Sequence, residues 1–209
     1  MQIIAHRGFW LDPSEKNTSI AFARALENGF GIETDFRDLN GELVISHDLP
    51  GDDAMPIGDF VSLYATACND VLMALNIKAD GLQSLVKKMV EDSGMENYFV
   101  FDMSVPDMRG YFSEGIPTFT RLSEYEQSPA FLDKSTGFWL DAFEGKWYDL
   151  PIINGLLKKN KQIVIVSPEL HGRTHRELWG FMKKNHLHQN PLISLCTDFP
   201  LEAREYFYV

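Results

Sequence analysis

The feature that most constrains the fold of this 209-residue chain is a regular alternation of short apolar runs with amphipathic segments. The apolar runs are typical of buried β-strands, and the segments between them carry apolar residues at the spacing of one helix face. The clearest helix begins near residue 82 and ends before Gly94, with Leu82, Leu85, Val86, Met89 and Val90 on one face. Eight strand-helix repeats of this kind are predicted, of which the fifth is poorly defined.

The repeats predict an α/β fold, a compact (β/α)8 TIM barrel, because strands separated by helices form parallel sheets. A doubly wound open sheet is the alternative, but no glycine-rich phosphate-binding fingerprint follows the first strand. A helical turn near 122–125 is expected in the fifth repeat. Residues 1–209 are expected to form one domain, with strands at 3–5, 31–37, 73–77, 98–101, 116–119, 137–140, 162–166 and 192–195 and an extra strand at 43–46.

Composition restricts the partners and the compartment. The formal net charge of −11, from 30 acidic and 19 basic residues, argues against a nucleic-acid or anionic membrane partner. Cys68 and Cys196 are too few for a disulfide framework, which favours a reducing compartment. The first residues show no signal-peptide core, and no apolar run reaches the length of a membrane span. We therefore expect a cytoplasmic protein with no stable membrane anchor; the sequence carries no signal for a particular oligomeric state.

An acidic strand followed by a hairpin brings candidate metal ligands and a histidine together. Glu33 and Asp35 are two residues apart in a predicted strand, so their carboxylates point to the same side. A cation between them relieves their repulsion, and oxygen ligands favour Mg²⁺ or Ca²⁺. Asn40-Gly41 predicts a two-residue turn, after which the run 43–45 returns His47 towards the carboxylates. A titratable imidazole beside a metal site indicates hydrolytic chemistry; a solvated acidic hairpin is the alternative.

The carboxyl ends of the predicted strands carry further polar residues, which is where a barrel of this type places its active site. For Asp198, two residues before Pro200, helix capping is the expected role. Polar side chains follow seven of the eight strands: His6 and Arg7, Glu33 and Asp35, Asn76 and Lys78, Asp102, Asp141, Ser167 and Glu169, and Asp198.

Two other candidates have weaker signals. Trp139 shares a strand face with Asp141 and is a candidate for lining a substrate pocket, although tryptophan is more often a core residue. His171 and His175 are four residues apart, but the glutamate of a zinc-protease motif is missing. Gly172 between them predicts a loop contact for these histidines.

Several of these motifs, taken in order, resemble the N-terminal signature of the glycerophosphodiester phosphodiesterase family. The resemblance covers about a quarter of the chain, and the related phosphatidylinositol-specific phospholipases C share the barrel and the paired histidines. The matching residues are His6-Arg7-Gly8, Asn17-Thr18, Phe22, Ala25, Gly29, Glu33-Thr34-Asp35, Asn40-Gly41 and His47-Asp48, and near the other end Thr197-Asp198-Phe199-Pro200.

The resemblance implies a barrel that cleaves phosphodiesters with one divalent cation, Mg²⁺ or Ca²⁺, and two histidines. By position, it makes His6 and His47 the acid-base pair, since histidine exchanges protons near neutral pH. It makes Glu33 and Asp35 metal ligands and places Arg7 at the phosphate. Lys78 is a second expected phosphate contact.

Two departures from the family pattern stand out. Asn76 occupies the position of the usual third acidic ligand, so an amide oxygen is expected to complete the metal site with one negative charge fewer. The subdomain that commonly caps the substrate is nearly absent, because only the short loop 49–56 follows His47-Asp48. An open pocket is therefore expected.

The sequence-based hypothesis is a metal-dependent phosphoric diester hydrolase with a place in lipid metabolism. It acts on a small-molecule substrate, a glycerophosphodiester or a related phosphodiester, by two-histidine general acid-base catalysis. A non-catalytic barrel that binds phosphate esters is one alternative. A phospholipase-like enzyme working at a membrane surface is the other, for which the segment 9–11 offers a few apolar side chains.

Overall fold

A ring of parallel strands is the centre of the protein. This computed structural model describes residues 1–66 and 71–209, so Cys68 lies outside the described part. The strands of the ring, in order, are β1 (Gln2–His6), β2 (Gly31–Leu39), β5 (Met73–Ile77), β6 (Tyr98–Phe101), β7 (Phe119–Leu122), β8 (Gly137–Leu140), β9 (Gln162–Val166) and β10 (Ile193–Thr197).

The ring is completed by two unlike junctions. β1 pairs with β10 over a full ladder that places Gln2 opposite Ser194. β6 and β7 meet at a single parallel bridge between Val100 and Thr118, where the Val100 amide donates to the Pro117 carbonyl at 2.9 Å. The predicted (β/α)8 barrel is confirmed.

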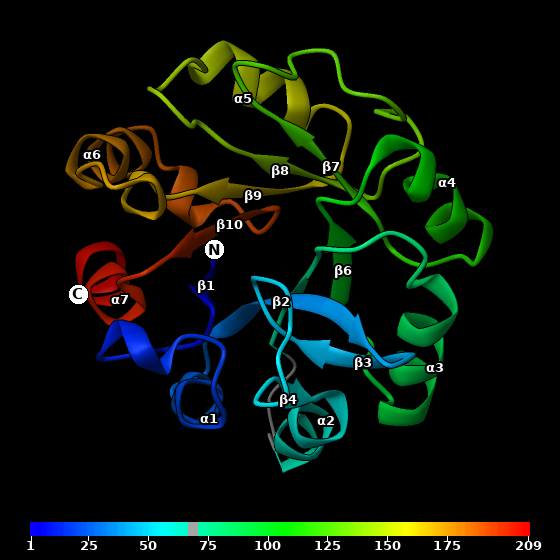
Figure 1. The fold of residues 1–209 in the computed structure, drawn as a ribbon. Helices are drawn as coiled ribbons and strands as arrows, with labels where there is room; N and C mark the ends of the chain where they lie inside the picture. The colour runs from blue at the N-terminus through cyan, green and yellow to red at the C-terminus, as the bar shows by residue number, and fades with distance from the viewer. Residues whose placement is uncertain (67–70) are drawn as a thin grey trace.

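The helices form an outer layer around the strands (Figure 1). Capping residues start two of them: the Asp149 carboxylate accepts from the Ile152 amide at 3.0 Å, and the Ser104 hydroxyl accepts from the Asp107 amide at 3.3 Å. The α-helices are α1 (Ser19–Glu27), α2 (Ile57–Thr66), α3 (Gln83–Ser93), α4 (Val105–Ser113), α5 (Leu150–Leu157), α6 (Arg176–Lys184) and α7 (Pro200–Tyr208), and the 3₁₀ helices are η1 (Pro13–Glu15), η2 (Pro168–His171) and η3 (Leu187–Gln189). No helix in the described ranges is long and apolar enough to cross a membrane.

The predicted hairpin is present as an extension of β2. β2 pairs antiparallel with β3 (Glu42–Ile45), which pairs with the two-residue strand β4 (Met55–Pro56). Asn40 and Gly41 form the two-residue turn with φ of 53° and 84°. Positive φ at both positions is what such a turn requires, and asparagine and glycine tolerate it best.

The fifth repeat differs from its prediction. The expected strand 116–119 begins three residues later as β7, and turns replace the expected helical segment near 122–125. Pro117 explains the shift, because it has no amide hydrogen to donate to a ladder and leaves only the single bridge to β6. No helix lies between β7 and β8, all of whose connecting residues are described.

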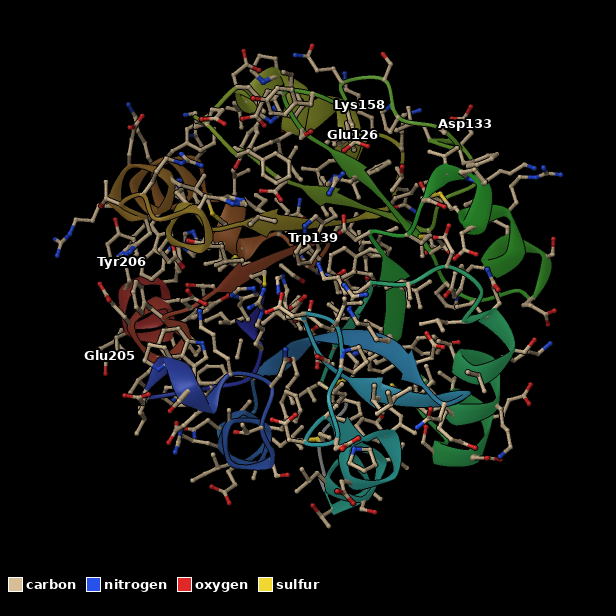
Figure 2. The ribbon with its side chains drawn as sticks, in the orientation of Figure 1. Glu126, Asp133, Trp139, Lys158, Glu205 and Tyr206 are labelled. Atoms are coloured by element: carbon tan, nitrogen blue, oxygen red, sulfur yellow. The ribbon has the colours of Figure 1, made fainter. Side chains whose placement is uncertain are left out.

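The apolar core has two parts, one outside the ring of strands and one inside it. The larger contains helix residues such as Phe22 and Val86 and lies between strands and helices. The smaller fills the barrel with alternate strand residues, among them Phe99, Phe101 and Trp139. Figure 2 shows Trp139 near the centre of the ring. The same two-residue alternation points His6, Glu33, Asp35, Asn76, Lys78, Arg121 and Asp141 to the inside.

Candidate active site

A cavity of about 290 Å³ lies at the carboxyl ends of the barrel strands. Asp35 is not part of its lining; this carboxylate is fully buried beside it. All the other residues predicted for the site line the cavity, namely His6, Arg7, Glu33, His47, Asn76, Lys78 and Trp139.

The cavity is open on the side of the hairpin. Arg7 and His47 also line a wider hollow of about 680 Å³, whose wall includes Leu49 and Gly51 from the loop after β3 and Pro56 from β4. A substrate therefore has an approach over this short loop.

His6, at the end of β1, is held by a carboxylate from the last strand-loop unit. Its Nδ1 lies 2.6 Å from Asp198 Oδ1, and its Nε2 lies 3.9 Å from Glu33 Oε2. The expectation that Asp198 caps a helix is wrong: the N-cap of α7 is Phe199, and the Asp198 side chain turns to His6 instead. Because a carboxylate accepts, His6 Nδ1 carries the proton and Nε2 faces the cavity side.

A charged network sets the ionisation of Asp198. Burial alone would raise the pKa of this carboxyl, but the hydrogen bond and charge of His6, with the charges of Lys16 and Arg7, lower it. Glu169 adds a fixed partner, since its Oε1 accepts from the Asp198 amide at 3.2 Å and from the Thr197 hydroxyl. Asp198 is therefore built to stay ionised and to position His6.

Replacing Asp198 with asparagine is expected to lower the free energy of unfolding by about 1.5 to 3 kcal/mol at pH 7, the usual worth of a hydrogen bond to a charged group. A carboxyl with a lowered folded-state pKa contributes stability above its unfolded pKa of about 3.9, and this is lost as pH falls through the folded value. Urea unfolding from pH 7 to pH 3 measures the difference. Asp48→Asn, at the exposed partner of His47, is the matched control; a cost at Asp198 that does not change with pH contradicts the assignment.

Glu33 is buried next to a second carboxylate. It is only 1% exposed, and burial, followed by the charge of Asp35, raises its pKa. Asn76, opposite Asp35 in the β2–β5 ladder, donates from Nδ2 to Glu33 Oε1 at 3.1 Å. The alternation of β2 thus produces the paired carboxylates that the sequence indicated.

Three side chains hold Asp35. Arg7 Nε lies 3.1 Å from Oδ2, Lys78 Nζ lies 3.5 Å from Oδ1, and Asn17 Nδ2 donates to Oδ2 at 2.8 Å. Thr34 donates its hydroxyl to Asn17 Oδ1 at 2.9 Å and so fixes the amide. Arg7 and Lys78, the two cationic side chains expected to bind a substrate phosphate, therefore both contact Asp35.

The donor atoms fit a hard divalent cation. Asp35 Oδ1 and Asn76 Oδ1 are buried without a hydrogen-bond partner, and a cation next to Glu33 would offset the repulsion that raises its pKa. No group of three or more His, Cys, Asp or Glu side chains in residues 1–66 and 71–209 has the arrangement of a metal site. A cation bound beside these carboxylates would find the unpartnered Asn76 amide oxygen as a further oxygen donor.

Ion pairs continue around the rim from Lys78. Asp102, after β6, lies 3.4 Å from Lys78 Nζ and 2.5 Å from Arg121 Nη1. Arg121, on β7, also pairs with Glu126 at 2.5 Å. Asp102 was among the rim residues noted in the sequence, whereas Arg121 was missed because it lies inside a strand whose start was placed three residues early.

His47 lines the cavity from the hairpin side. Its Nδ1 lies 2.9 Å from Asp48 Oδ1, and its side chain is 43% exposed, against 13% for His6. Arg37 Nε donates to the His47 carbonyl at 3.1 Å and fixes the backbone. The two histidines therefore line the same cavity, but His47 is more exposed to solvent than His6.

The wall formed by β8 and η2 contains aromatic and polar groups. Trp139 stacks on Phe101 with ring centroids 4.0 Å apart. His171 Nε2 lies 2.7 Å from Asp141 Oδ1, and its ring centroid is 4.9 Å from that of Phe143. His171 was predicted as a loop contact; the signal that it belongs here was its place just after β9, with Asp141 just after β8.

Comparison with known proteins supports the fold. The sequence matches no protein-family model. A comparison with curated proteins also gave no match. The structure is similar to a glycerophosphodiester phosphodiesterase from Agrobacterium tumefaciens str. C58, with a TM-score of 0.72 and 17% identity over 96% of this chain and 97% of that one.

Two further structures are similar over almost the whole chain. A glycerophosphoryl diester phosphodiesterase from Parabacteroides distasonis has a TM-score of 0.58 and 13% identity, with 98% of this chain and 85% of that one covered. A Ca²⁺-dependent phosphatidylinositol-specific phospholipase C from Streptomyces antibioticus has a TM-score of 0.56 and 11% identity, covering 97% and 95%. This chain therefore has the barrel fold of these phosphodiesterases and phospholipases C.

Proposed function

We propose that this protein is a phosphoric diester hydrolase that cleaves a glycerophosphodiester or a related small phosphodiester in the cytoplasm. The observation that carries the proposal is the carboxylate-held His6 in a cavity with Arg7, Lys78 and Glu33, beside the buried Asp35. The likeness to solved phosphodiesterases gives independent support at the level of the fold.

In the proposed reaction, Arg7 and Lys78 bind the non-bridging phosphate oxygens. His6, oriented by Asp198, exchanges a proton through Nε2 on one side of the phosphorus, and His47 does so on the other. One imidazole removes the proton of the attacking hydroxyl and the other protonates the leaving oxygen. A divalent cation held by Glu33, Asp35 and Asn76 would neutralise negative charge that develops on the phosphate.

An activity screen tests the proposal directly. Purified protein is incubated with glycerophosphodiesters that carry different head groups, in the presence of Mg²⁺, Ca²⁺ or a chelator. We expect cleavage that requires a divalent cation. Binding of phosphate esters without cleavage under any condition would reject the enzyme and leave the non-catalytic barrel.

One observation favours the membrane-surface alternative as a second candidate. Leu11, Leu49 and Tyr125 are 69%, 87% and 70% exposed, and each lies in a loop that follows a strand, after β1, β3 and β7. Apolar side chains on loops near the cavity are suited to contact a lipid surface. Co-sedimentation with neutral phosphatidylcholine vesicles tests this candidate, and no binding rejects it.

Replacing Asn76 with glutamate is expected to tighten the divalent cation by about tenfold or more, because a carboxylate adds a charge to the ligand set. Calorimetric titration with Mg²⁺ and Ca²⁺ measures the change. Asn76→Gln, which adds the same methylene without the charge, is the matched control. Equal or weaker affinity in Asn76→Glu means that Asn76 is not a ligand.

A further inference from the structure

The β8–β9 side of the cavity faces the catalytic side across the barrel. In the order of the closed ring, β8 lies opposite β2 and β9 lies opposite β5. Asp141 and His171 therefore stand across from the strands of Glu33 and Asn76. A phosphate bound near Arg7 and Lys78 would direct one of its two alcohol groups towards this wall.

The His171 ring is fixed in one orientation. Asp141 is 5% exposed and accepts from the Ala142 amide at 2.8 Å with the same Oδ1 that lies 2.7 Å from His171 Nε2. Phe143 borders the imidazole at a centroid distance of 4.9 Å. Neither the carboxylate nor the ring is free to reorient without losing these contacts.

This orientation leaves one ring nitrogen for a ligand. Since the carboxylate accepts, Nε2 carries the proton, and in the neutral imidazole Nδ1 is an acceptor. Among the described residues none makes a hydrogen bond with His171 Nδ1, and His171 is one of the residues that line the cavity. An acceptor on a partly exposed side chain of the lining, with no described protein partner, suits a hydroxyl donor.

The neighbouring side chains disfavour a cationic head group. Arg121 lies in the same lining and places its guanidinium 5.5 Å from the Phe143 ring, so the aromatic face that would attract a cationic head group is already taken. Trp139 and Leu170 add apolar surface to the same lining. The wall matches a small alcohol that has a carbon backbone and a hydroxyl.

We propose that His171, positioned by Asp141, is a specificity-determining residue that accepts a hydrogen bond from a free hydroxyl of the substrate's alcohol group. The inference rests on the proposed function for the phosphate side of the cavity. It adds a third histidine to the site with a role distinct from proton transfer, and it predicts a preference for hydroxylated alcohols over plain alkyl alcohols.

The test compares two ligands that differ by hydroxyl groups, glycerol 3-phosphate and propyl phosphate, in calorimetric titrations of the full protein. We expect the wild type to bind glycerol 3-phosphate on the order of tenfold more tightly, the usual worth of a good hydrogen bond. His171→Gln offers an amide to Asp141 but has no acceptor at the position of Nδ1, so the preference is expected to disappear. His171→Asn places an amide oxygen near that position and is expected to keep part of it.

His186→Asn is the control, since His186 is exposed and lies in a left-handed conformation that asparagine tolerates. A wild-type protein without the preference, or a His171→Gln variant that retains it, overturns the inference. Circular dichroism verifies folding, and if His171→Gln does not fold, loss of the preference in His171→Asn decides against the stated role of Nδ1. Because both ligands are monoesters, their affinities can be measured whether or not the protein cleaves phosphodiesters. A protein that cleaves no phosphodiester contradicts the proposed function, and the binding comparison still tests the role of His171.

Discussion

Replacing His6 with alanine is expected to lower turnover of a phosphodiester by about 100-fold or more, with little change in affinity for the divalent cation. The His6 ring is held by Asp198 at 2.6 Å and faces the cavity with its other nitrogen, so alanine removes the group that exchanges the proton. Arg7 and Lys78 remain to bind the phosphate. Steady-state kinetics and metal titration of the same preparation measure the two effects.

His47→Ala is expected to give a comparable loss, and the double variant is expected to lose less than the product of the two. Two groups that serve one proton-transfer sequence are not energetically independent. The wild-type rate is expected to follow a bell-shaped dependence on pH. Normal turnover in His6→Ala would assign the proton transfer to another group, for which Glu169, in contact with Thr197 and Asp198, is a candidate.

Replacing Glu33 with glutamine is expected to act in opposite directions on stability and on function. Without metal, the free energy of unfolding is expected to increase by about 1 to 2 kcal/mol, because glutamine removes a charge that is buried beside Asp35. Affinity for the divalent cation and turnover are expected to fall by about 100-fold or more, because the ion loses one of two carboxylates. Urea unfolding in chelator and metal titration measure these changes.

The stability gain of Glu33→Gln has a defined pH dependence. The pKa of Glu33 is raised above its ordinary value of 4.5, so the wild type loses stability as pH rises through the folded-state pKa. Below 4.5 the carboxyl is protonated in both states, and the advantage of glutamine should disappear. Glu96→Gln, at an exposed position, controls for loss of surface charge. A glutamine variant that is less stable than the wild type at pH 7 would mean that the ionised carboxylate stabilises the metal-free fold.

Local sequence patterns were enough to predict the fold. The two-residue period of β2 separates Ile32 and Phe36 from Glu33 and Asp35, so both the outer core and the inward carboxylates were visible in the sequence. The turn at Asn40-Gly41 was predicted because few residues adopt positive φ twice in succession. β7 was misplaced because Pro117 interrupts a pattern that depends on hydrogen bonding to a neighbouring strand.

Contacts between distant segments were not predictable in the same way. Asp198 and His6 are 192 positions apart. Their sequence neighbourhoods indicate only local roles, a helix cap for Asp198 and a residue at a strand end for His6. Their pairing depends on β10 closing against β1. The contact between His171 and Asp141 likewise depends on the register of β8 with β9, which one sequence does not reveal.

The junction of β1 with β10 also restricts how the protein acquires its active arrangement during synthesis. Because β1 leaves the ribosome long before β10, β1 has only β2 as a ladder partner until β10 has been synthesised. His6 cannot meet Asp198 before then, and one edge of β1 has no neighbouring strand. The pairing of β10 with β1 therefore completes the barrel and the His6-Asp198 contact in the same step. A nascent chain that lacks β10 would contain all the predicted catalytic, substrate-binding and metal-binding residues, but its His6 ring would have no Asp198 to hold it.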